Sequence, residues 1–323
     1  MKNILVTGSE GFVGSSLRLH LEKLKYNIYT LDRLDISREN YLCYDLKDEF
    51  NEIFESKIRS FNIDVVIHLA AAKGDFRLSD KDFHDDNVIA TNGLRNIIEK
   101  CEIHNVIHYS TVSVYGHNNL LKDESAELKP NNPYGVTKLE SEKILSEWYR
   151  SNEKEFCLTV LRPSVIYGIN SFTNMYNLIK NLNKSISITI GNGKYVKSMI
   201  SLENLIDITI FQIEKLSGLQ VYNCTDEPYP TLEETINYIC ELDGFNKPKI
   251  VIPFKISLLL SYPFELLSLI TKKDYGITRD RMRKFRTPTD YRSNLIRESG
   301  YKQKFDTKER LQRMAKWYLS LKK

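Results

Sequence analysis

The amino-acid sequence predicts an α/β protein in which a doubly wound parallel sheet is joined to a smaller mixed α/β C-terminal lobe. Short apolar runs alternate with helical patterns through the first half of the chain, the order expected of parallel strands with right-handed crossovers. Val65-Val66-Ile67 is apolar on both faces, as in a strand covered by helices on each side. The first apolar run also leads directly into a glycine-rich turn, Gly8 to Gly14, and then a helical pattern.

In chain order, the strands expected in the first half are Asn3–Thr7, Asn27–Asp32, Tyr41–Tyr44, Val65–Leu69, Asn105–Ser110 and Cys157–Pro163. The helices between them are Phe12–Leu24, Asp48–Ser60, Asn87–Cys101 and Pro133–Ser151. After Gly168 the alternation of strand-like and helical patterns becomes less regular. Helices are expected there at Met175–Leu182, Leu202–Leu216, Leu232–Asp243 and Lys308–Leu321, and strands at Ser187–Ile190 and Leu219–Asn223.

Composition is that of an ordinary soluble globular protein, with 41% hydrophobic and 27% charged residues in 323. A net charge of +4 argues against a nucleic-acid partner. The five cysteines form no CxxC pair, so we expect reduced thiols and neither a disulfide framework nor a metal site. Strand-like residues begin at Asn3 with no signal peptide before them, which indicates a cytoplasmic protein.

Two local segments depart from this average. The apolar stretch Ile256–Ile270 is interrupted by serines, Pro263 and Glu265 and is too short to span a bilayer. We expect a buried helix or the wall of a substrate cavity, in preference to an interfacial membrane patch, and no stable membrane insertion. The basic run from Lys272 to Arg286 is either a solvated helix face or a site for an anionic substrate.

The turn Gly8-Ser9-Glu10-Gly11-Phe12-Val13-Gly14 predicts a dinucleotide-binding site. Its glycines permit a tight turn and let the backbone approach a pyrophosphate, which then faces the helix N-terminus. Because the triplet follows a strand and precedes a helix, its context is that of a Rossmann-type domain. We assign residues 1–170 to this domain and 171–323 to a substrate-binding lobe that is partly interleaved with it, some segments returning to the sheet.

Asp32 ends the second predicted strand and favours NAD. A carboxylate there can accept hydrogen bonds from both adenosine ribose hydroxyls and would repel a 2′-phosphate. The next residue, Arg33, could instead pair with such a phosphate, so NADP is possible. The alternative for Asp32 is a simple turn residue. Asp45 and Leu46, after the third strand, are candidates to frame the adenine.

The fourth strand ends in His68-Leu69-Ala70-Ala71-Ala72, small residues where a nucleotide must pass close to the backbone. Leu69, Ala70 and Ala71 are therefore cofactor candidates, and Lys73 can reach a cofactor ribose or phosphate. His68 itself is expected to be a core histidine.

Tyr134 and Lys138 form the most informative pair for the reaction. Pro133 suits a first helical turn with Asn131 or Asn132 as its cap, which places Tyr134 and Lys138 on one helix face. A nearby ammonium and an oxidised nicotinamide would both lower the pKa of the phenol from about 10. Tyr134 could then take a proton from a substrate hydroxyl while hydride leaves the same carbon.

Hydroxyl residues follow the fifth strand in Ser110-Thr111-Val112-Ser113, at the edge where such sheets bind ligands. Thr111 is the main candidate to hold the reacting oxygen beside Tyr134, and Ser110 and Ser113 are lesser ones. Without Tyr134 downstream, a Ser/Thr-rich strand end would be the simpler interpretation.

Taken together, these motifs resemble the extended short-chain dehydrogenase/reductase family, the NAD-dependent epimerase/dehydratase group that modifies nucleotide sugars. The resemblance covers nearly the whole chain, and it includes Asn87 to Thr91 and Arg162 to Gly168. It implies Tyr134 as acid/base, Lys138 as its partner and ribose contact, and Thr111 as the substrate-positioning hydroxyl. It also implies cofactor contacts from Phe12, Val13, Asn87, Ser110 and Pro163. A cytoplasmic homodimer through the helices near Asn87–Cys101 and Pro133–Ser151 is implied as well.

The resemblance further places a sugar-nucleotide contact at Lys197, where the family commonly has Arg. Lysine would neutralise a diphosphate as a point charge, without a bidentate fork. Arg279 and Arg286, with Arg281, are further phosphate candidates.

The family's 4,6-dehydratases carry an Asp-Glu pair after the hydroxyl residue that corresponds to Thr111. Here the two positions hold Val112 and Ser113, neither of which moves a proton at neutral pH, so we argue against a dehydratase.

The prediction is therefore a UDP-hexose type 4-epimerase that acts through a transient 4-keto sugar. A nucleotide-4-keto-sugar reductase is the alternative, since Arg33 would suit an exchangeable NADP. Two further hypotheses are a hydroxysteroid-type dehydrogenase, with Ile256–Ile270 lining its pocket, and a catalytically inactive cofactor-sensing protein.

Overall fold

The computed structural model describes residues 2–72, 78–116, 121–271, 279 and 289–322. Its centre is a sheet of seven parallel strands. The strands are β1 (Asn3–Thr7), β2 (Asn27–Asp32), β3 (Tyr41–Cys43), β4 (Val65–His68), β5 (Asn105–Tyr109), β6 (Cys157–Pro163) and β10 (Leu219–Cys224). The order across the sheet is β10-β6-β5-β4-β1-β2-β3. The strand order reverses beside β1, so the carboxyl ends of β1 and β4 flank the crevice in which such sheets bind ligands.

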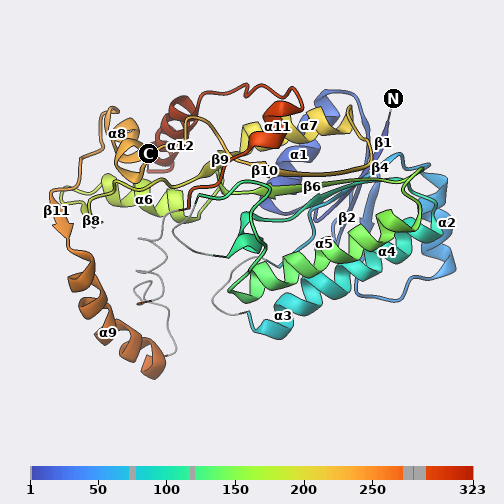
Figure 1. Cartoon of the computed structure of the whole chain (residues 1–323), viewed down its shortest axis with the longest axis horizontal. Coiled ribbons are helices and arrows are strands. Elements are labelled where there is room, and N and C mark those ends of the chain that lie inside the picture. Colours follow the sequence, from blue (N-terminus) through green and yellow to red (C-terminus); the bar gives the residue numbers. More distant parts are fainter. Residues whose placement is uncertain (1, 73–77, 117–120, 272–278, 280–288, 323) are drawn as a thin grey trace.

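Helices cover both faces of this sheet (Figure 1). One face packs on α1 (Phe12–Lys23), α7 (Leu202–Ile213) and α11 (Asn294–Glu298). The other packs on α2 (Glu52–Ser60), α4 (Ala90–Lys100) and α5 (Pro133–Ser151). Strand side chains alternate between the two layers: Ile4 and Val6 join the first cluster and Leu5 the second. This is why the buried strands are apolar on both faces.

A smaller lobe follows β6. It holds two short parallel pairs, β7 (Val165–Tyr167) with β9 (Met199–Ser201) and β8 (Ile188–Ile190) with β11 (Ile250–Ile252). Its separate core lies among α6 (Asn174–Leu182), α8 (Leu232–Cys240) and α12 (Thr307–Ser320). The chain leaves this lobe to form α7 and β10 on the main sheet and then returns to it.

The predicted fold class is confirmed, and each predicted strand and helix is present with its bounds shifted by a few residues at most. The helix expected at Asn87–Cys101 is interrupted: it comprises α3 (Asp80–His84), a π-helical turn η1 (Asp85–Ile89) and α4. A short 3₁₀ helix η2 (Val112–Tyr115) follows β5.

The apolar stretch at 256–270 departs from expectation. It lies in helix α9 (Phe254–Thr271), but most of its apolar side chains are exposed, so the prediction of a buried helix was wrong. No helix in the described part of the chain is long and apolar enough to cross a membrane.

Candidate active site

The glycine turn joins β1 to α1 with no room for side chains. Gly8 has φ +67°, and a Cβ on it would lie 2.5 Å from the backbone nitrogen of Ala70. A Cβ on Gly14 would lie 2.2 Å from the Gly8 carbonyl oxygen. Gly11 is the N-cap of α1, so the helix N-terminus opens at the carboxyl edge of the sheet. Backbone N–H groups in this arrangement can bind a pyrophosphate.

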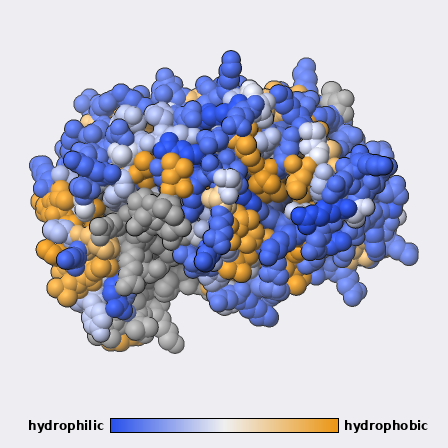
Figure 2. All heavy atoms as spheres, in the orientation of Figure 1, coloured by the Kyte–Doolittle hydropathy of each residue, from blue (hydrophilic) through white to orange (hydrophobic). Residues whose placement is uncertain are grey.

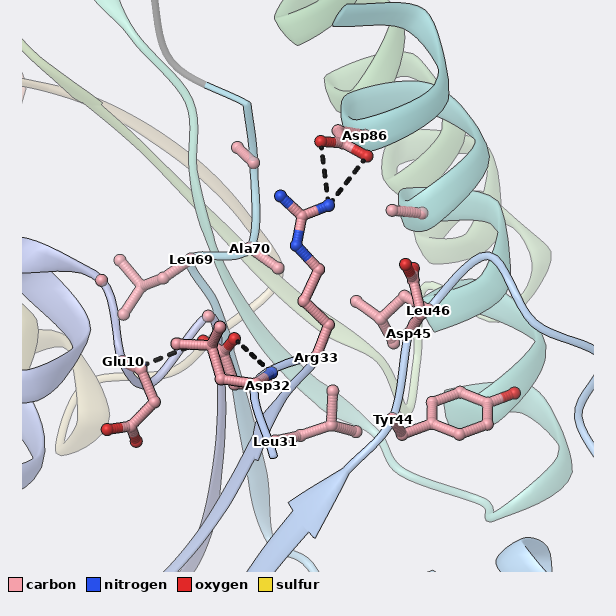
Figure 3. A pocket seen from close by; sticks show the side chains of 15 residues that line it. Glu10, Leu31, Asp32, Arg33, Tyr44, Asp45, Leu46, Leu69, Ala70 and Asp86 are labelled. Atoms are coloured by element: carbon pink, nitrogen blue, oxygen red, sulfur yellow. Dashed lines mark hydrogen bonds and ion pairs between the residues drawn. The ribbon is translucent and has the colours of Figure 1, made fainter. Parts of the chain in front are cut away.

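A cavity of about 320 Å³ lies beside this turn (Figure 3). The predicted cofactor residues that line it are Gly8, Gly11, Asp32, Arg33, Asp45, Leu46, Leu69, Ala70 and Ala71. The loops after β1, β2, β3 and β4 thus meet as expected for a nucleotide site. Sequence reasoning missed Glu10 and Asp86, which also line the cavity.

The cavity is rich in carboxylates. Asp32 accepts a hydrogen bond from the Glu10 backbone N–H at 3.0 Å, which fixes its side chain at the mouth of the turn (Figure 3). Glu10 pairs with Arg38 at 2.6 Å, and this hydrogen-bonded partner lowers the pKa of the Glu10 carboxyl. These carboxylates would oppose the extra charge of a 2′-phosphate.

Arg33 points across the cavity to η1, where its Nη1 lies 3.2 Å from an Asp86 carboxylate oxygen (Figure 3). Lys47 contacts the same carboxylate at 2.7 Å. The cation that could have received a 2′-phosphate therefore already has an anionic partner, and the geometry favours a ribose hydroxyl next to Asp32.

Two neighbours of the cavity serve the framework. His68 is buried between the hydroxyls of Thr7, at 2.8 Å, and Thr91, at 3.2 Å. Burial lowers its pKa to about 3, so it is neutral, and its assignment as a core histidine is confirmed. Asn87 is also buried; its side chain accepts from the Ala72 N–H at 2.7 Å and donates to Thr137 at 2.9 Å. It thereby ties the loop after β4 to helix α5.

The predicted reaction residues meet where α5 begins. Asn132 caps the helix by accepting from the Gly135 N–H at 2.9 Å, with Pro133 in the first turn. A Cβ on Gly135 would lie 2.6 Å from the Ser113 carbonyl oxygen, so the first turn of α5 presses against η2. Thr111, the N-cap of η2, consequently hydrogen bonds to the Tyr134 phenol and lowers its pKa.

Burial dominates the protonation of this pair. It raises the pKa of Tyr134 to about 12, against the smaller effect of Thr111. It lowers the pKa of Lys138 to about 7, while Glu142 acts in the opposite direction. The sequence-based expectation of a lowered tyrosine pKa thus differs from this structure, because desolvation disfavours the charged form of both groups. Positive charge from an oxidised nicotinamide, and from Lys138 when it is protonated, would favour the phenolate.

Glu142 and Arg162 were missed as functional residues. Glu142 continues the Tyr134–Lys138 spacing by another turn of α5, and it is buried, as is Arg162 on β6. Arg162 donates from Nε to Oε1 at 2.9 Å and from Nη2 to Oε2 at 2.6 Å. Ser110 also donates to Glu142. The Thr111 hydroxyl donates to Ser113 Oγ at 3.3 Å and is also the hydroxyl that interacts with Tyr134. The repeated four-residue spacing could have revealed Glu142.

Further hydrogen bonds connect the ion pair to β10 and to the segment before α11. Arg162 donates to the Tyr115 hydroxyl at 2.8 Å, which donates to Asn223 on β10 at 2.9 Å. The Asn223 amide in turn donates to the backbone carbonyl of Arg292 at 2.9 Å. One chain of hydrogen bonds, buried over most of its length, therefore joins the reaction helix, η2, the strands β6 and β10 and the segment leading to α11.

The substrate candidates are dispersed. Lys197 stands just before β9, and burial lowers its pKa to about 8; its Nζ lies 5.3 Å from the centre of the Tyr195 ring. Arg279 instead pairs with Glu265 of α9 at 2.6 Å. Lys73, Arg281 and Arg286 lie outside the described residues. Val112 and Ser113 lie in η2 next to Thr111 and bring no carboxylate there.

The arrangement can bind a dinucleotide along the carboxyl edge and move a proton at Tyr134. The model of the NAD dependent epimerase/dehydratase family matches residues 4–225. The chain is 30% identical over 302 residues to the N-acetyl-α-D-glucosaminyl-diphospho-ditrans,octacis-undecaprenol 4-epimerase of Escherichia coli O157:H7, covering 93% of this chain and 90% of that protein.

Two further relatives show the breadth of the similarity. A dTDP-D-glucose 4,6-dehydratase of Dictyostelium discoideum is 29% identical over 256 residues, which are 69% of this chain and 58% of that protein. The structure of UDP-glucuronic acid 4-epimerase from Bacillus cereus in complex with NAD superposes with a TM-score of 0.76 at 21% identity, over 99% of this chain and all (100%) of that one. The shared fold therefore extends over the smaller lobe as well.

Proposed function

The chain belongs to the NAD dependent epimerase/dehydratase family, and from this premise we propose that it is an NAD-dependent 4-epimerase of a hexose linked through a diphosphate. The observation that carries the proposal is the meeting of Thr111 with Tyr134, one helical turn before Lys138, at the same sheet edge as the acidic nucleotide cavity. A site of this kind suits oxidation and reduction of a secondary alcohol.

NAD is the proposed cofactor. Gly8, Gly11 and Gly14 would admit the pyrophosphate to the N-terminus of α1, together with Phe12 and Val13 in the first turn of that helix. Asp32 would receive the adenosine ribose hydroxyls, with Asp45 and Leu46 near the adenine. The small residues after β4 and Pro163 at the end of β6 would border the nicotinamide half. Bound NAD supplies the acceptor, and later the donor, of a hydride.

The chain's own residues move the proton. Tyr134, as the phenolate, would take the proton of the C4 hydroxyl, with bound NAD as the acceptor of the C4 hydride, so that a 4-keto sugar would result. Thr111 holds the same oxygen by a hydrogen bond, and Lys138 stabilises the phenolate. Once the sugar has turned over in the site, the C4–H bond forms on the opposite face and Tyr134 returns the proton.

A dehydratase would need an acid and a base for loss of a C6 hydroxyl. Val112 and Ser113 supply neither, which argues against that activity although one relative carries it in its name. A 4-keto-sugar reductase would use the same three residues in one direction. The pairing of Arg33 with Asp86 favours tightly held NAD, and hence the epimerase.

A homodimer is proposed through α4 and α5, which lie side by side on one face of the sheet (Figure 1). Val136 on α5 is exposed, and a surface groove runs along Val136, Leu139 and Ile144. All three lie on α5, and apolar side chains along one helix are suited to a helix–helix contact between two copies.

The test is incubation of purified protein with UDP-hexoses and UDP-N-acetylhexosamines without added cofactor. Formation of the C4 epimer supports the proposal. Strict dependence on added NADH or NADPH, with net consumption of it, would assign the protein as a reductase instead.

A further inference from the structure

Among the side chains of helix α9 that the structure describes, most apolar ones face outward and two serines face inward. Ile256, Leu259, Leu260, Pro263, Phe264, Leu267 and Ile270 are exposed and recur at intervals of three and four, so they form one stripe along the helix. Leu259 and Ile270 are 74% and 72% exposed. Among the described side chains of α9, the buried ones are Ser257 and Ser261, whose hydroxyls donate to backbone carbonyls three residues earlier. In water this is the reverse of the usual amphipathic order.

The stripe continues onto the neighbouring sheet. Ile250 and Val251 on β11 and Ile188 on β8 are exposed as well, and apolar residues gather over this end of the molecule (Figure 2). Helix α9 projects from β11 away from the rest of the smaller lobe (Figure 1). No other helix or strand among the described residues packs extensively on it. Contiguous exposed apolar surface of this kind marks an interaction site.

The charged residues in and after α9 indicate what kind of partner binds the apolar stripe. Between residues 254 and 286 the sequence carries eight basic and three acidic side chains. Of these, Lys255 is exposed at the first turn of α9, and Arg279 pairs with Glu265 and stacks over Tyr262. An apolar helix that is followed in the sequence by excess positive charge fits the interface of an anionic bilayer. The helix does not meet the requirements of a bilayer span, so it would lie along the surface.

We propose that the apolar stripe of α9 docks in the interface of an anionic membrane, and that the active site epimerises a hexose carried there on a polyprenyl diphosphate. The second half of this inference rests on the proposed function. A polyprenyl chain keeps its sugar at the membrane, so an enzyme that acts on it must come to the bilayer surface. The relative that matches 93% of this chain carries an undecaprenol diphosphate in its name.

The diphosphate explains why one fold can serve both carriers. A nucleotide sugar and a polyprenyl-linked sugar present the same diphosphate next to the hexose, where the cation of Lys197 is expected. They differ beyond it, in a base and ribose on one side and a branched hydrocarbon on the other. An apolar helix turned toward solvent suits the hydrocarbon.

Docking is tested by co-sedimentation of the full chain with vesicles of phosphatidylcholine and phosphatidylglycerol at 7:3, and with phosphatidylcholine alone. We expect binding that is stronger on the anionic vesicles. Leu259→Glu and Ile270→Glu should each weaken it by about tenfold or more, because each places a charge where an apolar side chain would enter the bilayer interface. Ile53→Glu is the matched control: Ile53 is 84% exposed on α2, and its variant should sediment like the wild type.

Failure to bind either vesicle would overturn the docking surface. So would a wild-type dimer that the α9 variants convert to a monomer, measured by light scattering, since a second copy of the chain would then cover the stripe. Equal loss of binding in Ile53→Glu would also contradict the assignment of the surface to α9.

The carrier is tested by giving the wild type vesicle-embedded polyprenyl-diphospho-N-acetylglucosamine and, separately, UDP-N-acetylglucosamine. Epimerisation of the lipid-linked sugar with a higher kcat/KM supports the inference. Epimerisation of the UDP-sugar alone refutes the lipid carrier while the proposed function stands. If neither sugar is epimerised, the proposed function is wrong. The docking of α9 is tested separately, by the vesicle co-sedimentation.

Discussion

Arg162 on β6 and Glu142 on α5 form a bidentate ion pair, and both side chains are buried. Nε lies 2.9 Å from Oε1, and Nη2 lies 2.6 Å from Oε2. Glu142 lies one helical turn beyond Lys138, and it is the charged group that raises the pKa of that lysine. The pair therefore anchors the reaction helix to the sheet and sets the charge next to the reaction residues. Its loss would affect both stability and chemistry.

Replacing Glu142 with alanine should cost about 3–5 kcal/mol in the free energy of unfolding, because it leaves the Arg162 guanidinium buried without its counter-ion. Glu140→Ala, on the exposed face of the same helix, is the control and should change stability by less than about 0.5 kcal/mol. Urea denaturation of both variants makes the comparison. Similar values for the two would contradict the anchoring role.

Tyr134→Phe should lower kcat by about 10²–10⁴-fold, the usual contribution of a positioned acid/base. Bound NAD and the thermal midpoint should stay close to wild type, since the ring is kept. Steady-state kinetics together with the nucleotide content of the purified variant provide the measurement. A rate near that of the wild type would remove Tyr134 from the chemistry.

Gly135→Ala tests the contact that brings Tyr134 to Thr111. The new Cβ would lie 2.6 Å from the Ser113 carbonyl oxygen, so the first turn of α5 must move away from η2. We expect kcat to fall by tenfold or more, roughly 1.4 kcal/mol or above, with a smaller change in KM. Arg150→Ala, exposed near the other end of the same helix, should leave both unchanged. If Gly135→Ala behaved like this control, the contact between α5 and η2 would not be needed for activity.

Asp86→Ala should relax the preference for NAD. Removal of the carboxylate that pairs with Arg33 and Lys47 frees two cations beside the adenosine ribose, and we expect the affinity for NADP relative to NAD to rise by about tenfold. The double variant Asp86→Ala/Arg33→Ala should lose most of that gain. Competition binding with the two nucleotides measures the ratio, and an unchanged ratio would contradict the role given to Arg33.

The buried carboxyl of Asp226 predicts a pH effect on stability. Burial raises its pKa from 3.8 to about 6, so between these values the folded protein binds the proton more tightly than the unfolded chain. This contribution is therefore present at low pH and is lost as pH rises through about 6. Relative to Asp226→Asn, the wild type should gain roughly 1–3 kcal/mol between pH 7 and pH 4. Denaturation curves at the two pH values would show a constant difference if Asp226 did not titrate in this way.

Much of this fold was readable from the sequence because its signals are local. Strand and helix periods placed the main sheet, and the turn from Gly8 to Gly14 with Asp32 placed the nucleotide cavity. The Tyr134–Lys138 spacing and the hydroxyl at Thr111 located the residues that we propose for the reaction.

What the sequence did not reveal depends on contacts between distant segments. Arg33 pairs with Asp86 and Arg162 pairs with Glu142. Each partner belongs to another element, so the sequence around the arginine does not predict it. The π-helical turn at Asp85–Ile89 was not predicted. The spacing of apolar residues through it is almost the same as in an α-helix, so the sequence predicts an ordinary helix there. The stretch 256–270 read as a buried helix because its composition is apolar, whereas the structure turns those side chains outward.

The central claim is oxidation and reduction at C4 by tightly bound NAD. The most direct measurement is conversion of a UDP-N-acetylhexosamine deuterated at C4, by purified protein without added cofactor, followed by NMR and mass spectrometry. Our account predicts that the C4 epimer forms with the deuterium retained at C4 and with a primary isotope effect on kcat. Formation of the epimer with the label lost to solvent would contradict it, because C4 would then have exchanged a proton and not a hydride.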